Sequence, residues 1–226
     1  SLLRLGRCRM DWKALLRTCT NGSSELMSSV SMSLVSMLYN LQLIKYAGEN
    51  GIAAYGVIMY VNFVFLSVFI GFSIGSAPIF GFNHGAENHE ELRGLLRKSL
   101  VLLELFAVGM TVTAMVLAEP LSRVFVGYDT ALLDMTVRAF RIYALSFLVC
   151  GFNIFGSSLF TALNNGLISA VISFVRTLIC QIAAVMILPV FFELDGIWFA
   201  VVAAELAALV LTAFFVVKYR RRYHYM

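Results

Sequence analysis

Apolar stretches long enough to cross a lipid bilayer recur along nearly the whole of this 226-residue chain. A bilayer core about 30 Å thick is crossed by a helix of about 20 apolar residues, since a helix rises about 1.5 Å per residue. Apolar residues make up 60% of the chain and charged residues only 13%, whereas soluble domains carry about 25% charged residues. The chain is therefore predicted to be an integral membrane protein.

The apolar stretches divide into six predicted transmembrane spans. They cover about residues 23–46, 52–82, 93–117, 131–163, 167–188 and 196–217. We expect the third span to stop before Pro120 and the fifth before Pro189, because proline cannot continue a helix. The stretches are too long for strands and lack period-two alternation. The predicted class is all-α, a polytopic bundle of six transmembrane helices.

Polar segments flank the predicted bundle at both ends. Residues 1–22 are basic and amphipathic, and we expect a linker helix on the membrane surface, with Asp11 as its N-cap and a break at residues 21–22. Residues 219–226 are predicted to be a basic cytoplasmic tail. A chain that opens at Ser1 without an initiator methionine is interpreted as a fragment of a longer protein.

The distribution of Lys and Arg predicts the orientation in the membrane. With the N-terminus inside, the segments between spans place twelve of these residues on the inner side and four on the outer side. Basic residues accumulate on the cytoplasmic side of membrane proteins. Both termini are therefore predicted to be cytoplasmic, in a multi-pass protein of the cell membrane, with the bacterial inner membrane as the expected compartment.

Four ionisable residues lie within or at the edge of the predicted spans. A charge at a helix centre costs about 2.5–3.5 kcal/mol and persists mostly where it is paired or used. Glu205 lies near the middle of the sixth span and Arg176 within the fifth, so they are candidates for a structural ion pair, for ion coupling or cation binding at the acid, or for both. Glu104 lies where interfacial water could satisfy it, and Glu25 lies in a first helical turn, where capping is the simpler role.

Uncharged polar and soft apolar residues accompany these charges. They either hold helices together or line a cavity that binds chemically varied cations through weak contacts. The candidates for cavity lining are Tyr39, Asn40, Gln42, Asn62, Asn153 and Met37.

Several other functions are excluded by what the sequence contains. The basic residues form no continuous face of the kind that binds nucleic acid. The four cysteines are far apart, which predicts free thiols: Cys8, Cys19, Cys150 and Cys180. His84, Glu87 and His89 match no strong metal-site spacing, so no metal is expected. No nucleophile elbow or phosphate-binding loop is present, so we predict neither an enzyme nor an ATP-driven pump, and no cofactor.

The segment from residue 71 to residue 88 resembles the G-x-x-x-G-x-x-P-x-x-G-x-N-x-G-A-x-N pattern of multidrug and toxic compound extrusion (MATE) transporters. The main motif positions are Gly71, Gly75, Pro78, Gly81, Asn83 and Gly85. Segments 161–166 and 196–205, with Arg176 and Pro189, support the resemblance, which covers about residues 22–218.

The resemblance implies one lobe of a two-lobe transporter. Family members are similar in having twelve helices in two six-helix lobes, with a central cleft between them. This chain would be the C-terminal lobe, and its opening segment would be the linker between lobes. Its expected partners are the lipid bilayer, organic cation substrates and the missing N-terminal lobe. The family exports organic cations in exchange for protons or sodium ions, because neutralising a buried acid changes the preferred helix packing.

The sequence departs from the resembled family where sodium is bound. Sodium-coupled members carry acids on the first and fourth helices of this lobe, and those positions hold Ser31 and Asn153 here. The coupling acid is then expected at Glu205, Glu25 or Glu104, or in the other lobe.

Two alternatives to efflux stay open. A lipid-linked sugar flippase of the same superfamily should have a more basic cavity than one arginine supplies. An intramembrane enzyme would need paired catalytic residues at similar depth, and Glu205 has no evident partner of that kind.

Overall fold

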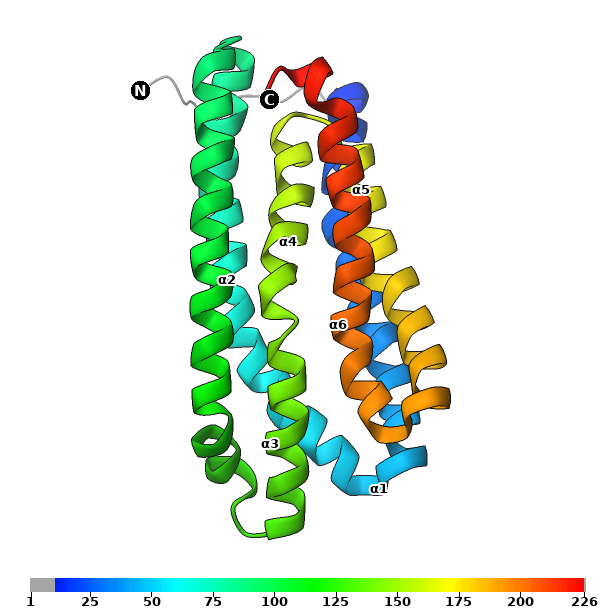
Figure 1. Cartoon of the computed structure of the whole chain (residues 1–226). Coiled ribbons are helices and arrows are strands. Elements are labelled where there is room, and N and C mark those ends of the chain that lie inside the picture. The colour runs from blue at the N-terminus through cyan, green and yellow to red at the C-terminus, as the bar shows by residue number, and fades with distance from the viewer. Residues whose placement is uncertain (1–10, 226) are drawn as a thin grey trace, which may run out of the picture.

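The computed structural model describes residues 11–225, without the side chains of residues 14, 17, 20–25, 27 and 28. The described residues form a bundle of long helices with no strand (Figure 1). The elements are α1 (Trp12–Gly85), α2 (His89–Val126), α3 (Thr130–Ala144), α4 (Phe147–Ala162), α5 (Gly166–Phe174), the π-helix η1 (Val175–Cys180) and α6 (Gln181–Tyr223). The predicted all-α class is confirmed.

Two of the elements, α1 and α6, turn back on themselves at a single non-helical residue. In α1 this residue is Gly48, with φ 62° and ψ −149°, and in α6 it is Glu193, with φ 50° and ψ −128°. Glycine adopts positive φ at little steric cost, whereas such a φ is uncommon for glutamate. Figure 1 shows the ribbon reversing direction at the lower end of each of these elements. Each is therefore a helical hairpin with two legs.

The capacity to cross a membrane follows from these lengths. Among the described residues, three helical stretches are long and apolar enough to cross a bilayer: Ser29–Gly85, His89–Val126 and Gly166–Tyr223. The pair α3 and α4, bent by 47°, makes a fourth if it is taken as one span. The breaks at Gly48 and Glu193 divide two of these stretches into two legs each, which agrees with six passes. The predicted count of six spans is supported in part and stays a prediction.

Two helices continue past the prolines at which the sequence predicts that they stop. The sequence predicts that the third span stops at Pro120, but α2 continues through this proline to Val126. It predicts that the fifth stops at Pro189, but the helix continues as far as the break at Glu193. Proline removes one backbone hydrogen bond, and membrane helices tolerate this because neighbouring groups satisfy the freed carbonyl.

The predicted surface linker is also different. Residues 1–10 lie outside the described part of the chain. Asp11 caps α1 as expected, because its Oδ1 accepts a hydrogen bond of 2.9 Å from the backbone N–H of Lys13. The backbone stays helical through residues 21–22, so no break separates a linker from the first span. One glycine costs a helix only about 1 kcal/mol, which a long helix outweighs.

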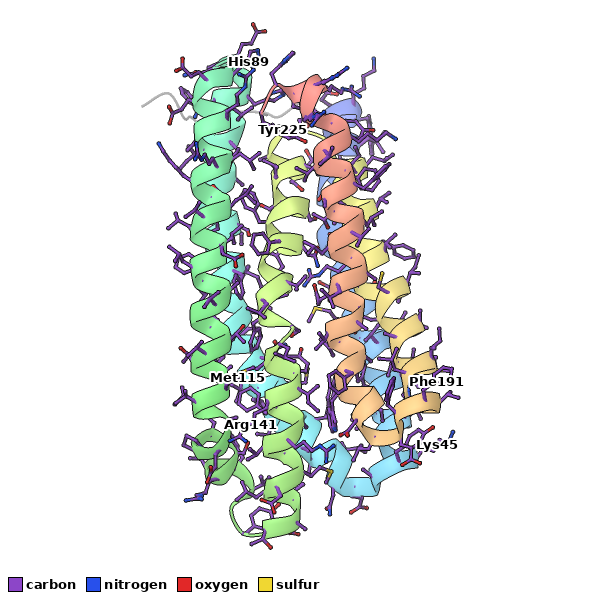
Figure 2. All side chains as sticks on the ribbon, in the orientation of Figure 1. Lys45, His89, Met115, Arg141, Phe191 and Tyr225 are labelled. Atoms are coloured by element: carbon purple, nitrogen blue, oxygen red, sulfur yellow. The ribbon has the colours of Figure 1, made fainter. Side chains whose placement is uncertain are left out.

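The two ends of the bundle carry different residues. The start of α1, the α1–α2 turn, the α4–α5 turn and the end of α6 lie at one end (Figure 1). Figure 2 labels His89 and Tyr225 at this end, and Lys45 and Arg141 at the other. The described end of α6 is helical to Tyr223, so the predicted tail begins as helix. The end of the bundle with His89 and Tyr225 therefore holds the segments that are predicted to be cytoplasmic. The orientation of the chain in the membrane stays a prediction.

The turn between α4 and α5 forms where Asn164, Asn165 and Gly166 predict it. Asn164 takes the left-handed conformation with φ 57°, and the Asn165 Oδ1 accepts a hydrogen bond of 3.4 Å from the N–H of Ile168. Asparagine suits both roles. The turn lays α5 antiparallel to α4, so that side chains at four-residue spacing on the two helices face each other.

Close helix contacts in the described chain use glycines other than the first two of the sequence motif. A Cβ added at Gly71 or Gly75 would meet no atom within 4 Å. A Cβ at Gly151 would lie 2.5 Å from Cδ1 of Phe69, and one at Gly156 would overlap Cγ2 of Thr212. Within this chain, α4 therefore provides the close approach that the motif glycines are expected to provide.

We expect the substitution Gly156→Ala to destabilise the bundle by about 1–3 kcal/mol, the usual cost of overpacking a core. The new methyl group on α4 would displace Thr212, whose Cγ2 occupies the space that a Cβ at residue 156 needs. Denaturant titration in detergent measures the loss. The control is Gly109→Ala on α2, where a Cβ meets nothing within 4 Å. Equal stabilities of the two variants would contradict this assignment.

Candidate functional site

A buried ion pair joins the two ionisable residues that the sequence places deepest in the apolar spans. Arg176 lies on η1 and Glu205 on α6. Nη2 of Arg176 lies 3.0 Å from Oε1 of Glu205, and Nε lies 3.0 Å from each of the two carboxylate oxygens. The side chains are only 15% and 6% exposed. The two charges are thus neutralised against each other in the interior.

The π-helix places the guanidinium at this position. The six residues Val175–Cys180 interrupt an otherwise α-helical leg that runs from α5 into α6. A π-turn is wider than an α-turn and often occurs at functional sites. In this leg it shifts the side chains after Phe174 relative to those before it, and Arg176 meets the second leg of α6 across the interface.

Asn153 on α4 completes the set of groups around the carboxylate. Its Nδ2 donates to Oε2 of Glu205 at 2.8 Å and to the backbone oxygen of the same residue at 2.9 Å. The Oδ1 of Asn153 accepts a hydrogen bond of 3.0 Å from Thr212. Asn153 is fully buried. Every oxygen of the carboxylate therefore has a partner, and one network links α4, η1 and α6.

Four hydroxyl groups continue this polar interface toward the α4–α5 turn. Thr161 Oγ1 donates to Ser169 Oγ at 2.7 Å. Ser157 Oγ lies 2.8 Å from Ser169 Oγ and 2.8 Å from Ser173 Oγ. We call these four residues the hydroxyl seam. It lies between α4 and α5. Ser157 follows Asn153 by four residues, and Ser173 precedes Arg176 by three.

The residues predicted to line a cavity occupy different environments. Tyr39 is 1% exposed, stacks on Tyr55 with ring centroids 5.4 Å apart, and donates to Gln181 Oε1 at 2.9 Å. Asn153 belongs to the buried network. Asn62 is also buried, and its Oδ1 accepts no hydrogen bond from the described residues. These three therefore lie inside the bundle, because the helices pack over them, and their lining role stays a prediction.

The other three lie closer to the surface. Gln42 is half-buried and its Nε2 lies 3.3 Å from Sδ of Met186. Asn40 is half-buried and Met37 is 62% exposed. A lining role for these three stays a prediction, since such a cavity would need a further wall.

The remaining predicted acids do not join the buried network. Glu104 is exposed on α2. The side chain of Glu25 lies outside the described residues. Ser31, at the position expected for a family acid, is buried on α1. Of the candidate acids with described side chains, Glu205 is the one that the fold places at a buried polar site.

The motif positions on the second leg of α1 lie mostly at its surface. Gly71, Gly75, Pro78 and Gly85 are exposed, and Gly81 and Asn83 are half-buried. A Cβ at Gly81 would lie 3.4 Å from the backbone oxygen of Ala162, and Asn83 donates to its own helix at Ile79.

A pocket of about 540 Å³ opens between the end of α2 and α3, away from the buried network. Charged residues line it, including Arg138 and Arg123. These two arginines are already paired, Arg138 with Asp195 on α6 and Arg123 with Glu119. Both pairs are exposed to a large extent, and the residues that line the pocket do not include those of the buried network.

Sequence reasoning misses Thr212, Gln181 and the hydroxyl seam. A signal for the seam is present, since Asn153, Ser157 and Thr161 recur every four residues and so share one face of a helix. Ser169 and Ser173 repeat the same spacing on the next helix.

Comparisons with known proteins agree with the fold. The family model described as MatE matches residues 26–187. No curated protein matches the chain. Among solved structures, the chain is similar to an outward-facing multidrug resistance MATE family transporter of the MOP superfamily, with a TM-score of 0.90 and 18% identity, over 99% of this chain and 50% of that one.

Two further solved structures are similar in fold to most of this chain. A mutant of the Vibrio cholerae MATE transporter VcmN has a TM-score of 0.85 and 18% identity, over 95% of this chain and 49% of that one. A MOP superfamily transporter from Pyrococcus furiosus has a TM-score of 0.84 and 19% identity, over 95% of this chain and 48% of that one. The chain spans about half the length of the solved structures that it matches.

Proposed function

The chain belongs to the MatE family, and from that membership we propose that it forms one lobe of a secondary active transporter that exports organic cations in exchange for protons or sodium ions. The likeness in fold to a multidrug resistance transporter supports the proposal. The chain covers about half of that transporter, which supports a second lobe as the missing partner.

The observation that carries the proposal is the buried network of Arg176, Glu205 and Asn153. It ties together three elements, α4, η1 and α6, through one carboxylate. Neutralising that carboxylate would leave Arg176 as an uncompensated buried charge, which costs about 3–5 kcal/mol. A cost of this size is enough to change which of two helix arrangements is preferred. The network therefore has the physical property that a coupling site requires.

The surface supports a two-lobe assembly. Met37 is 62% exposed and Met32 is 59% exposed on the first leg of α1. Unbranched thioether side chains suit a surface that binds varied apolar cations. In the proposed assembly, this leg forms one wall of the pathway and the second lobe forms the other.

The test is efflux of a fluorescent organic cation from liposomes that contain the complete two-lobe transporter. We expect export to require an inward proton or sodium gradient and to stop when an ionophore collapses it. Export that continues without any gradient would contradict secondary transport. A parallel assay with a lipid-linked sugar separates the flippase alternative, because translocation of that lipid without cation export would favour a flippase.

A further inference from the structure

The Glu205 carboxylate is more accessible to a proton than to a metal cation. Its two oxygens already accept hydrogen bonds from Arg176 and Asn153. A sodium ion needs several oxygen ligands and would have to displace the guanidinium, whereas a proton needs one lone pair of one oxygen. Asn153 offers little help to a cation, because its Oδ1 already accepts a hydrogen bond from Thr212 and its Nδ2 points at Glu205.

The hydroxyl seam has the connectivity of a proton relay. Its members are linked in the order Thr161, Ser169, Ser157 and Ser173, with oxygen separations of 2.7, 2.8 and 2.8 Å. A hydroxyl both donates and accepts hydrogen bonds. Each group can accept a proton from one neighbour and release its own proton to the next. One proton then moves along the seam, and every hydroxyl is regenerated after the chain reorients.

The two ends of the seam lie at a bundle end and beside the ion pair. Thr161 lies in the last turn of α4, next to the α4–α5 turn. At the other end, Ser157 follows Asn153 by four residues and Ser173 precedes Arg176 by three. At about 1.5 Å per residue, these offsets are about 6.0 and 4.5 Å along the helix axis. A proton needs a bridging water to pass between the seam and the carboxylate.

Two helices can be held together without hydroxyl groups that contact one another. Ser158, the next residue on α4, also joins two helices, but its Oγ donates to the backbone oxygen of Ser73 at 3.1 Å. Ser67 and Ser76 donate to carbonyls of their own helix. Two seam hydroxyls also contact backbone oxygens, Thr161 that of Ser157 at 3.2 Å and Ser157 that of Ser169 at 3.3 Å. The seam still differs, because hydroxyl contacts hydroxyl at shorter distances three times in succession, and Ser169 and Ser173 are buried.

We propose that Thr161, Ser169, Ser157 and Ser173 form a proton path between the α4–α5 end of the bundle and Glu205. The inference rests on the proposed transport function and selects the proton as the coupling ion. The path exchanges a proton between the carboxylate and the α4–α5 end: the protonated carboxylate is a neutral acid that releases Arg176, and loss of the proton along the seam restores the ion pair. Net proton transport requires the other exchange to take place from the opposite end of the bundle, after the helices have rearranged.

The experiment follows proton uptake by the complete transporter in detergent after a pH jump, with a pH-indicator dye. We expect Ser157→Ala to slow uptake about tenfold or more, since it removes two of the three hydroxyl contacts of the seam, while the number of protons taken up stays the same. Ser158→Ala is the matched control and should keep the parent rate. Ser157→Thr retains a hydroxyl and should restore most of the rate.

Uptake by Ser157→Ala at the parent rate, or equal slowing by Ser158→Ala, overturns the proton path. Ser173→Ala serves as the second variant if Ser157→Ala does not fold, with the same expected slowing. The variant Glu205→Gln distinguishes a failure of the proposed coupling site from a failure of the proton path. If this variant keeps full proton uptake and gradient-driven export, the proposed coupling site is wrong. If it loses proton uptake while Ser157→Ala keeps the parent rate, only the path is wrong.

Discussion

Replacement of Arg176 by leucine is expected to lower the free energy of unfolding by about 3–5 kcal/mol, because it leaves the Glu205 carboxylate as an uncompensated charge in the interior. The carboxylate is 6% exposed and would keep only the Asn153 amide as a partner. Removing both charges, with Arg176→Leu and Glu205→Leu together, is expected to restore most of the lost stability. A buried ion pair often contributes little net stability relative to an apolar pair of similar volume.

A double-mutant cycle in denaturant titrations of the detergent-solubilised protein measures this coupling. The control pair is Arg138 and Asp195, whose side chains are 70% and 34% exposed. Arg138→Leu should cost no more than about 1 kcal/mol, as is typical of exposed ion pairs. Additive effects of the two substitutions in the buried pair would show that the charges do not stabilise each other, and the network would then have no special role.

The fold class is predictable because it depends on one quantity, the length of apolar sequence between polar turns. The turn at Asn164–Gly166 and the cap at Asp11 are predictable as well, since both depend on local backbone hydrogen bonds. The helix ends near Pro120 and Pro189 are not predictable in this way. Proline removes one local bond, and whether the helix continues depends on partners that local sequence does not specify.

The chain reversals depend on more than residue type. Gly48 is a reasonable candidate for a turn, because glycine adopts positive φ easily. Glu193 is not, since glutamate rarely adopts a φ of 50° and does so here where two legs of α6 must reverse.

The sequence predicts that the site lies deep in the apolar spans, but it does not predict all of the residues that form the site. A charge in an apolar span needs a partner, and this requirement alone is enough to pair Arg176 with Glu205 from the sequence. Hydroxyl groups give a weaker signal, because a serine can satisfy its hydrogen bonds on its own helix, as Ser67 does. Whether Tyr39 lines a cavity stays a prediction, because the position of a residue along a span does not reveal which side of the helix is covered. Its partner Gln181 lies 142 residues away.

Neutralising the acid itself is expected to have the largest effect on transport. Glu205→Gln should reduce gradient-driven export by up to about 150-fold, the upper end of typical coupling free energies between two sites. Glutamine keeps a carbonyl oxygen that accepts from Arg176 and nearly the same shape, so insertion in the membrane should stay intact even though the Arg176 charge loses its counterion, at a cost of about 3–5 kcal/mol. It does not titrate, and therefore the carboxylate charge can no longer alternate between paired and neutral states. Export from liposomes along a proton gradient, at equal protein density, measures the change.

Glu104→Gln provides the matched control for this substitution. Glu104 has the same side chain at an exposed position on α2, outside the buried network, so its neutralisation should leave export close to the parent level. Equal losses in the two variants would show that the effect comes from net charge and not from the ion pair. Unchanged export in Glu205→Gln would reduce Glu205 to a packing residue, and the coupling acid would then be expected at Glu25 or in the second lobe, since the path to Glu205 would lead to a group that transport does not use.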